Sequence, residues 1–272
     1  MFDYEKYVLI GIGDFSHGDE NIWKYRINFI KDLLKNTKKK ITIFNEDNKF
    51  HSDNIMNSNK RLSYYKSYGL YKNKYPYGPL SKYCNRVYDS SIYLKFIKLI
   101  RKNKDRMKII GIDPDKLERD KLMAINIIDK LHTSHINLFF AHNGHVDSRK
   151  ITEEYETKWH NEKYRCGYYL KQKFEDKYCI ILSTGYKGTV RFDCNCDDKY
   201  CTNRIPYEKP IFEKFEIKEY KNINDGLYDK FSSKIYEFTA CKFSSNKPFI
   251  QNTKTYDYIL FFKNIKKLNL IT

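Results

Sequence analysis

Short apolar runs alternate with amphipathic stretches over the first two thirds of the chain. Five runs have the length and composition of β-strands: YVLIGI (7–12), KKITIF (39–44), MKIIGI (107–112), INLFFA (136–141) and YCIILS (178–183). Residues 19–36 carry apolar side chains at positions 22, 23, 27, 30, 33 and 34, the spacing of an amphipathic helix. Three further helices are predicted at 90–103, 117–133 and 167–174. Strands that alternate with helices predict an α/β fold with a mostly parallel sheet flanked by helices.

The rest of the chain fits into the same domain. A length of 272 residues suits one α/β domain, 1–272. KPIFEKFEIKEY (209–220) and YDYILFFKNI (256–265) predict additional strands. The segment 48–90 is rich in Tyr and Lys and predicts an insertion or lid within the domain. Aromatic side chains interleaved with basic ones could also stack bases or sugars.

Polar side chains follow the predicted strands where each strand ends. Ligands of open parallel sheets bind outside the carboxyl ends of the strands, so these side chains should form one site. The candidates are Asp14, His17, Glu46, Asp113, His142 and His145. Three histidines beside carboxylates can activate water through a general base, or bind a divalent metal with an open position. The residue types alone do not separate these two hypotheses.

Arg26 lies on the apolar stripe of the first predicted helix, in phase with Ile22 and Ile30. A buried guanidinium needs an anionic partner, and Asp14, Glu46 or a substrate carboxylate could supply it. The alternative is an arginine whose charged end reaches solvent at the end of the helix.

Three common motifs are absent. In GIGDFSHGDE (11–20), Ser16 occupies the position of the third glycine of a dinucleotide-binding loop. Acids stand where a P-loop has Lys and Ser or Thr, and they would repel phosphate. The chain also lacks GxSxG, so a serine hydrolase of the α/β type has no support.

The formal charge of +17 first suggests a polyanionic partner. Apart from short groups such as Lys38–Lys40, however, the basic residues are scattered among acids, whereas a nucleic-acid site is a cluster. A diffusely positive surface is therefore favoured over nucleic-acid binding, and a basic polyanion-binding protein remains an alternative.

The N-terminal sequence MFDYEKYVLI lacks the basic and apolar regions of a secretory signal, and no apolar run approaches the ~18 residues of a membrane span. Seven cysteines, an odd count, then predict reduced thiols, a cytoplasmic location and no membrane partner. Cys194, Cys196 and Cys201 are three potential metal ligands without an obvious fourth, so a structural zinc site is disfavoured there.

Several segments resemble motifs of the erythromycin esterase family, in the family's order and over nearly the whole chain. IGIGDFSHGDENIW resembles the opening Gly-x-Gly-Glu-x-x-His-Gly motif, and Arg26 follows His17 by the family's nine residues. IFNED places Glu46 where the family has a glutamate after its second strand. Further similarity is found in FIKLIRKNKDRMKIIGID, RDKLMAINIIDKL, FFAHNGH, GYYLKQKFEDKYCIILSTGYKG and YDYILFF.

The resemblance implies hydrolysis of an ester or lactone by water, with neither a serine nucleophile nor a cofactor. His17 would be the general base, oriented by Asp14 and Glu46. The implied catalytic residues are His17, Glu46, Asp14 and His142. The implied substrate-binding residues are Arg26, His145 and Asp113. The implied partner is a small-molecule ester or lactone.

Two departures from the family pattern change these expectations. Asp14 stands where the family has Glu, one methylene longer, so altered or lost activity is expected if the reach to His17 changes. Only 67 positions separate Glu46 from Asp113, whereas macrolide-hydrolysing members carry a much larger helical insertion there. We therefore expect a reduced insertion and a substrate that need not be a macrolide.

Overall fold

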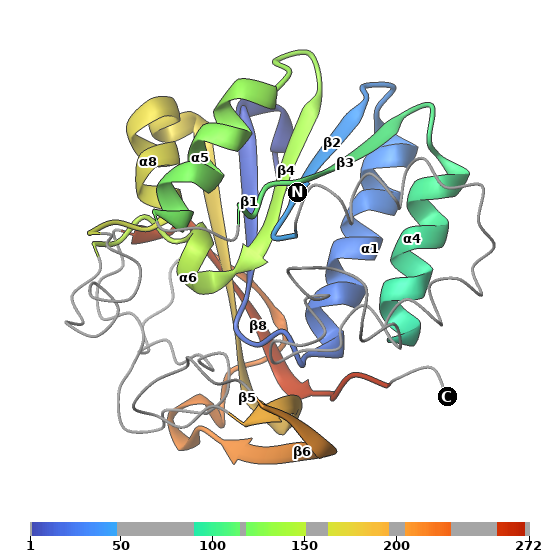
Figure 1. Ribbon diagram of the computed structural model, residues 1–272, viewed down its shortest axis with the longest axis vertical. Helices are drawn as coiled ribbons and strands as arrows, with labels where there is room; N and C mark the ends of the chain where they lie inside the picture. The colour runs from blue at the N-terminus through green and yellow to red at the C-terminus, as the bar shows by residue number, and fades with distance from the viewer. Residues whose placement is uncertain are drawn as a thin grey trace.

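The structure is a computed structural model that describes residues 2–47, 90–114, 118–150, 163–195, 205–229 and 255–269 (Figure 1). Its centre is an eight-stranded sheet with the order β3-β2-β4-β1-β5-β8-β7, and β6 pairs with β5 outside this path. The strands are β1 (Leu9–Asp14), β2 (Ile41–Asn45), β3 (Met107–Gly111), β4 (Ile136–His142), β5 (Tyr178–Asn195), β6 (Ile205–Glu216), β7 (Gly226–Tyr228) and β8 (Tyr258–Ile265). Pairing is parallel from β3 to β8, and only β6 and β7 run antiparallel to their neighbours.

Helices cover both faces of this sheet. The α-helices are α1 (Glu20–Asn36), α4 (Ser91–Lys102), α5 (Arg119–Lys130), α6 (Asn143–Val146) and α8 (Cys166–Phe174). Three 3-10 turns are η1 (Tyr4–Lys6), η4 (Glu175–Lys177) and η5 (Lys218–Tyr220). Figure 1 shows α1 and α4 on one side of the strands and α5 and α8 on the other. The predicted α/β class with a mostly parallel sheet is therefore confirmed.

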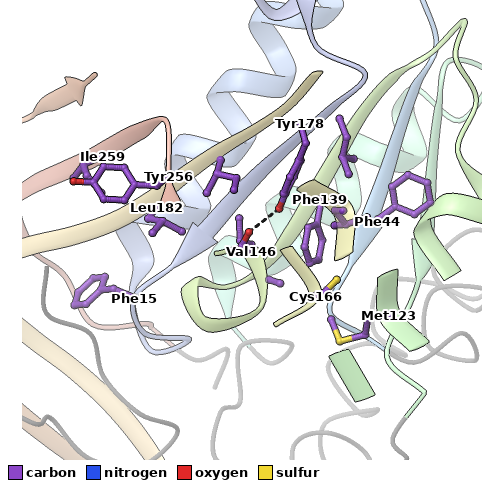
Figure 2. Packing of buried hydrophobic residues seen from close by; sticks show 14 of the residues in the cluster. Phe15, Phe44, Met123, Phe139, Val146, Cys166, Tyr178, Leu182, Tyr256 and Ile259 are labelled. Atoms are coloured by element: carbon purple, nitrogen blue, oxygen red, sulfur yellow. Dashed lines mark hydrogen bonds between the residues drawn. The ribbon is translucent and has the colours of Figure 1, made fainter. Parts of the chain in front are cut away.

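The α1 helix illustrates how the sequence sets these elements. Asp19 caps its first turn, because its carboxylate accepts the Asn21 N–H at 2.7 Å. The predicted apolar stripe packs against β1 and α4 in one of two core clusters, and all of its residues except the partly buried Leu34 are buried. The second cluster lies on the face covered by α5 and α8 (Figure 2). There the Tyr178 hydroxyl donates to the Val146 carbonyl at 2.7 Å, which ties β5 to α6.

Some element bounds differ from the sequence prediction. β5 continues beyond the predicted end at Ser183 to Asn195, because β8 and β6 supply pairing partners along its second half. α5 is shorter than predicted, and α6 was not predicted because four residues carry no helical period. Residues 48–89 of the Tyr- and Lys-rich segment 48–90 lie outside the described residues, as do the thiols Cys196 and Cys201.

Two further findings concern thiols and membranes. Cys166 and Cys179 are both buried. Within the described ranges, no helix has the length and apolar character needed to cross a membrane.

Candidate active site

The carboxyl ends of four parallel strands bring the predicted polar residues to one edge of the sheet. Asp14 and His142 are register partners at the ends of β1 and β4. Glu46 directly follows β2, and its N–H donates to the Phe140 carbonyl of β4 at 2.8 Å. Asp113 follows β3, and its N–H donates to the Asp47 carbonyl at 2.9 Å. His17 and His145 stand on the segments that leave β1 and β4, so all six residues belong to one polar cluster.

Asp14 joins His17 to Arg26. Its Oδ1 lies 3.0 Å from Nδ1 of His17, and its Oδ2 lies 3.1 Å from NH1 of Arg26. Burial opposes the charge of Asp14, but the cations at His17 and Arg26 outweigh burial and lower its pKa. Burial likewise opposes a charge on His17, yet the Asp14 carboxylate prevails and raises the pKa of His17. The shorter aspartate therefore still reaches the histidine.

Arg26 has the anionic partner that its helical phase required, and that partner is Asp14. Its NH2 group also donates to the carbonyls of Ile12 and Ala141, at 2.6 and 3.0 Å. The guanidinium lies 4.8 Å from the Phe140 ring and its residue is only 1% exposed. Arg26 thus lies behind Asp14, on the side away from solvent, whereas the His17 side chain is 29% exposed.

Glu46 is held at both oxygens. Its Oε2 accepts the backbone N–H of His142 at 2.7 Å. Its Oε1 lies 2.8 Å from NH2 of Arg119 and 3.3 Å from Nε2 of His145. Burial opposes the charge of Glu46, but His145, His17 and Arg119 hold its pKa well below the usual range. Glu46 is therefore an ionised carboxylate whose position is fixed by the contacts at both of its oxygens.

His145 lies between two carboxylates. Its Nδ1 is 2.7 Å from Oδ1 of Asp120, opposite the contact of Nε2 with Glu46. Burial disfavours the charged ring, but the charges of Asp120 and Glu46 raise the pKa of His145 to about 10. Arg119 NH1 also lies 3.0 Å from Nε2 and opposes that charge. Because a guanidinium can only donate, the Arg119 contact needs Nε2 as an acceptor, as in the neutral ring with its proton on Nδ1 toward Asp120.

His142 differs from the other two histidines of the site. Its Nδ1 accepts the N–H of Gly144 at 3.2 Å, since His142 caps α6. Burial and the nearby charge of His17 lower its pKa to about 4. The ring is therefore neutral near pH 7, and the proton lies on Nε2 because Nδ1 is an acceptor. Its centroid lies 5.3 Å from that of His17.

Asn143 ties the start of α6 to β5. Its side-chain amide donates to the Ser183 carbonyl at 2.8 Å and accepts the Ser183 N–H at 3.0 Å. The Ser183 hydroxyl accepts the N–H of Phe15 at 3.0 Å, so the loop that carries His17 is fixed to the same strand. These buried bonds hold the β1 and β4 ends in register.

Two residues of the cluster were missed by the sequence analysis. Arg119 and Asp120 form the first turn of α5, inside the RDKLMAINIIDKL segment. Arg119 donates to both oxygens of Asp113, at 2.9 and 2.6 Å. Asp113 is thus engaged by Arg119, and its residue is 8% exposed. The available signal was a pair of opposite charges, Arg119 and Asp120, at the start of a predicted helix. The helical spacing of apolar residues, however, does not indicate which residues these charges contact.

The metal hypothesis finds no ligand set in the part of the chain that the structure describes. No group of three or more His, Cys, Asp or Glu side chains in these ranges could hold a metal ion. The contacts above explain this, because the carboxylates are turned toward guanidinium groups and imidazoles.

A pocket of about 260 Å³ lies apart from the polar cluster, between α1 and α4. None of the cluster residues lines it. Its lining residues are Lys24, Ile27, Asn28, Lys31, Ile92 and Lys95.

The fold and the cluster define an α/β protein with a histidine and carboxylate site at the carboxyl edge of a parallel sheet. Comparison with known proteins adds a family. The family model described as erythromycin esterase matches residues 95–210. Together with the fold, this match supports assignment of the chain to the erythromycin esterase family, which indicates a hydrolase of the esterase type. No curated protein matches the sequence significantly.

Three solved structures share the fold at 11% identity each. A succinoglycan biosynthesis protein superposes with a TM-score of 0.67 and covers 98% of this chain and 90% of its own. A mutant of the erythromycin esterase EreC in its open conformation has a TM-score of 0.64, with coverage of 99% and 93%. A Bacillus cereus protein also has a TM-score of 0.64, with coverage of 97% and 90%. At this identity the likeness concerns the fold.

Proposed function

We propose that the protein hydrolyses a small-molecule ester or lactone, with water activated by His17. The observation that carries this proposal is the Asp14–His17 pair, in which Asp14 occupies Nδ1 at 3.0 Å and the His17 side chain is 29% exposed. A carboxylate can only accept, so its closeness to Nδ1 favours the proton of the neutral ring on that nitrogen and would leave Nε2 to accept a proton from water.

His142 is proposed to stabilise the oxyanion. Its ring is neutral near pH 7 and carries its proton on Nε2, which makes it a hydrogen-bond donor. In the reaction, His17 Nε2 takes a proton from water while the water oxygen attacks the carbonyl carbon. The oxyanion so formed would accept from His142. The carbon–oxygen bond to the alcohol then breaks, and the alkoxide takes the proton from His17, which yields an acid and an alcohol.

The other cluster residues are proposed to support this pair. Arg26 would keep Asp14 ionised from behind, because its guanidinium is buried and holds Asp14 Oδ2. Asp113 would act through Arg119, which it holds at both oxygens. The resemblance implied that Arg26 and Asp113 bind the substrate directly. Both are buried and bonded within the protein, which favours the indirect roles proposed here.

The test is a panel of activated esters and macrolides assayed with the wild type and His17→Ala. Loss of a general base should lower kcat/KM by about 10²–10⁴-fold. His132→Ala is the matched control, because His132 precedes β4 at the amino ends of the strands, where its ring centroid lies 4.7 Å from that of His135. Equal turnover by wild type and His17→Ala would exclude the role of His17.

A further inference from the structure

The turn that carries His17 is bonded on both sides to parts of the sheet that come late in the chain. On one side the Phe15 N–H donates to the Ser183 hydroxyl of β5 at 3.0 Å. On the other side the Gly18 carbonyl accepts the N–H of Leu268 at 3.1 Å. One residue besides His17 lies between these two anchors. The positions of β5 and of the chain after β8 therefore set where His17 stands.

Residues 266–269, the C-terminal strap, continue from β8 past the starts of α1 and α4 (Figure 1). The Glu20 N–H in the first turn of α1 donates to the Lys266 carbonyl at 2.8 Å. The Ser91 N–H at the start of α4 donates to the Asn269 carbonyl at 2.9 Å. Backbone hydrogen bonds thus join the strap to both helices that cover this face of the sheet.

Asn21 connects the same segment to α1 through its side chain. Its carboxamide donates to the Asn264 carbonyl at the end of β8 at 2.9 Å, and it accepts the Lys266 N–H at 2.9 Å. A carboxamide can donate and accept at once, so one side chain holds the backbone on both sides of the junction between β8 and the strap. A second carboxamide, that of Asn269, donates to the Glu20 carboxylate at 3.0 Å.

We propose that Asn21 is a positioning residue, which locks the C-terminal strap onto α1 and thereby holds the His17 turn in place at the edge of the sheet. The inference rests on the proposed function for its catalytic consequence. His17 has to lie within hydrogen-bond reach of both Asp14 and the attacking water, and a displacement of about 1 Å can cost about 10²-fold in rate. Asn21 acts through the turn and not on the substrate.

The contact between His17 and Asp14 gives a readout that needs no substrate. Burial lowers the pKa of His17, but Asp14 and Glu46 outweigh burial and raise it, with His145 opposing them. His142 also faces the ring, with its centroid 5.3 Å away. If the turn moves, His17 loses its contact of 3.0 Å with Asp14, and its titration midpoint falls toward the ordinary 6.5.

The experiment compares wild type and Asn21→Ala by NMR titration of the histidine rings and by hydrolysis of activated esters, with His17→Gln used to assign the His17 signals. In Asn21→Ala the His17 midpoint should fall. The value of kcat should fall by about 10- to 100-fold with KM nearly unchanged, because the general base is displaced.

Asn103→Ala is the matched control. It also removes a carboxamide that donates to a backbone carbonyl, that of Leu99 at 2.8 Å, but it does so at the end of α4 opposite to the strap. Both the His17 midpoint and kcat of Asn103→Ala should therefore match those of wild type.

Two results would overturn the proposal: a His17 midpoint in Asn21→Ala equal to that of wild type, or an equal fall in Asn103→Ala. If Asn21→Ala does not fold, hydrogen exchange in wild type decides. The Leu268 N–H should then be protected as strongly as the amides of β8, and its rapid exchange would show that the strap does not hold the turn. A wild type without esterase activity contradicts the proposed function, while the His17 midpoints still decide the role of Asn21.

Discussion

Nδ1 of His17 lies 3.0 Å from Oδ1 of Asp14, one turn of chain earlier, and the same carboxylate reaches Arg26 with its second oxygen. One aspartate therefore connects a partly exposed histidine to a buried arginine. The arginine donates to carbonyls of two neighbouring strands, β1 and β4, so the sheet holds Arg26 and Asp14 in place and thereby positions the His17 ring.

Asp14→Asn should change the pH profile of ester hydrolysis. His17 must be neutral to accept a proton, and Asp14 raises the pKa of His17 against the effect of burial. Removing the carboxylate should therefore move the acidic limb of kcat/KM to lower pH. The plateau should fall by about 10²-fold or more, because the imidazolium of the transition state loses its counter-charge.

The control for this profile is Asp105→Asn, an exposed aspartate in the turn before β3. It should reproduce the wild-type limb and plateau. An acidic limb that stays in place in Asp14→Asn would contradict the coupling between Asp14 and His17.

Arg26→Met should destabilise the fold strongly. It removes the NH1 contact with Asp14 at 3.1 Å and the two bonds to strand carbonyls, and leaves a buried carboxylate without its cation. Breaking a buried pair in this way costs about 3–5 kcal/mol of unfolding free energy, measurable by urea denaturation.

Lys31→Met is the matched control, since Lys31 lies on the exposed side of the same helix and should change stability by about 0.5 kcal/mol or less. The double variant with Asp14→Asn should recover part of the loss, because the uncompensated charge is gone. Equal stability of Arg26→Met and Lys31→Met would show that the buried pair contributes nothing.

The sheet edge was more predictable from the sequence than the contacts within it. Apolar runs such as INLFFA located the strands, and the rule for parallel sheets then gathered Asp14, Glu46 and His142 at one edge. Which side chains of the cluster form ion pairs depends on the lengths of the side chains and on where α5 begins after its preceding turn. Neither of these is visible in the periodic pattern of apolar residues. Arg119 and Asp120 were missed for this reason. Arg26 was an intermediate case: the helical phase predicted its burial, but three anions could have been its partner.

Asp19→Asn should make stability less dependent on pH. Asp19 is fully buried, and burial, with a smaller contribution from the Asp14 charge, raises its pKa to about 8 from an ordinary 3.8. The folded protein thus holds this proton to higher pH than the unfolded chain does. The stabilisation that protonated Asp19 contributes is fully present below pH 3.8 and is lost as the pH rises through about 8.

Asparagine cannot ionise but caps a helix as well as aspartate. The stability of Asp19→Asn relative to wild type should therefore rise between pH 5 and 8, by up to about 1.4 kcal/mol per pH unit. Urea unfolding at several pH values measures this difference, in which other titrating groups cancel. Parallel curves for the two proteins would contradict a raised pKa at Asp19.

Gly167→Ala should disturb the contact between α8 and the helix that follows His142. A Cβ at Gly167 would lie 2.0 Å from the Val146 carbonyl oxygen and 2.5 Å from that of Asp147, and backbone atoms cannot move aside as a side-chain end can. Overpacking of this kind costs about 1–3 kcal/mol or more.

Gly226→Ala is the control, because the nearest atom to its Cβ would be at 3.4 Å, an ordinary contact. Since α6 carries His145, Gly167→Ala should also lower esterase activity in the folded fraction, while Gly226→Ala should not. Both variants are tested by thermal unfolding and by turnover per folded molecule. Equal effects of the two substitutions would contradict close packing of α6 on α8.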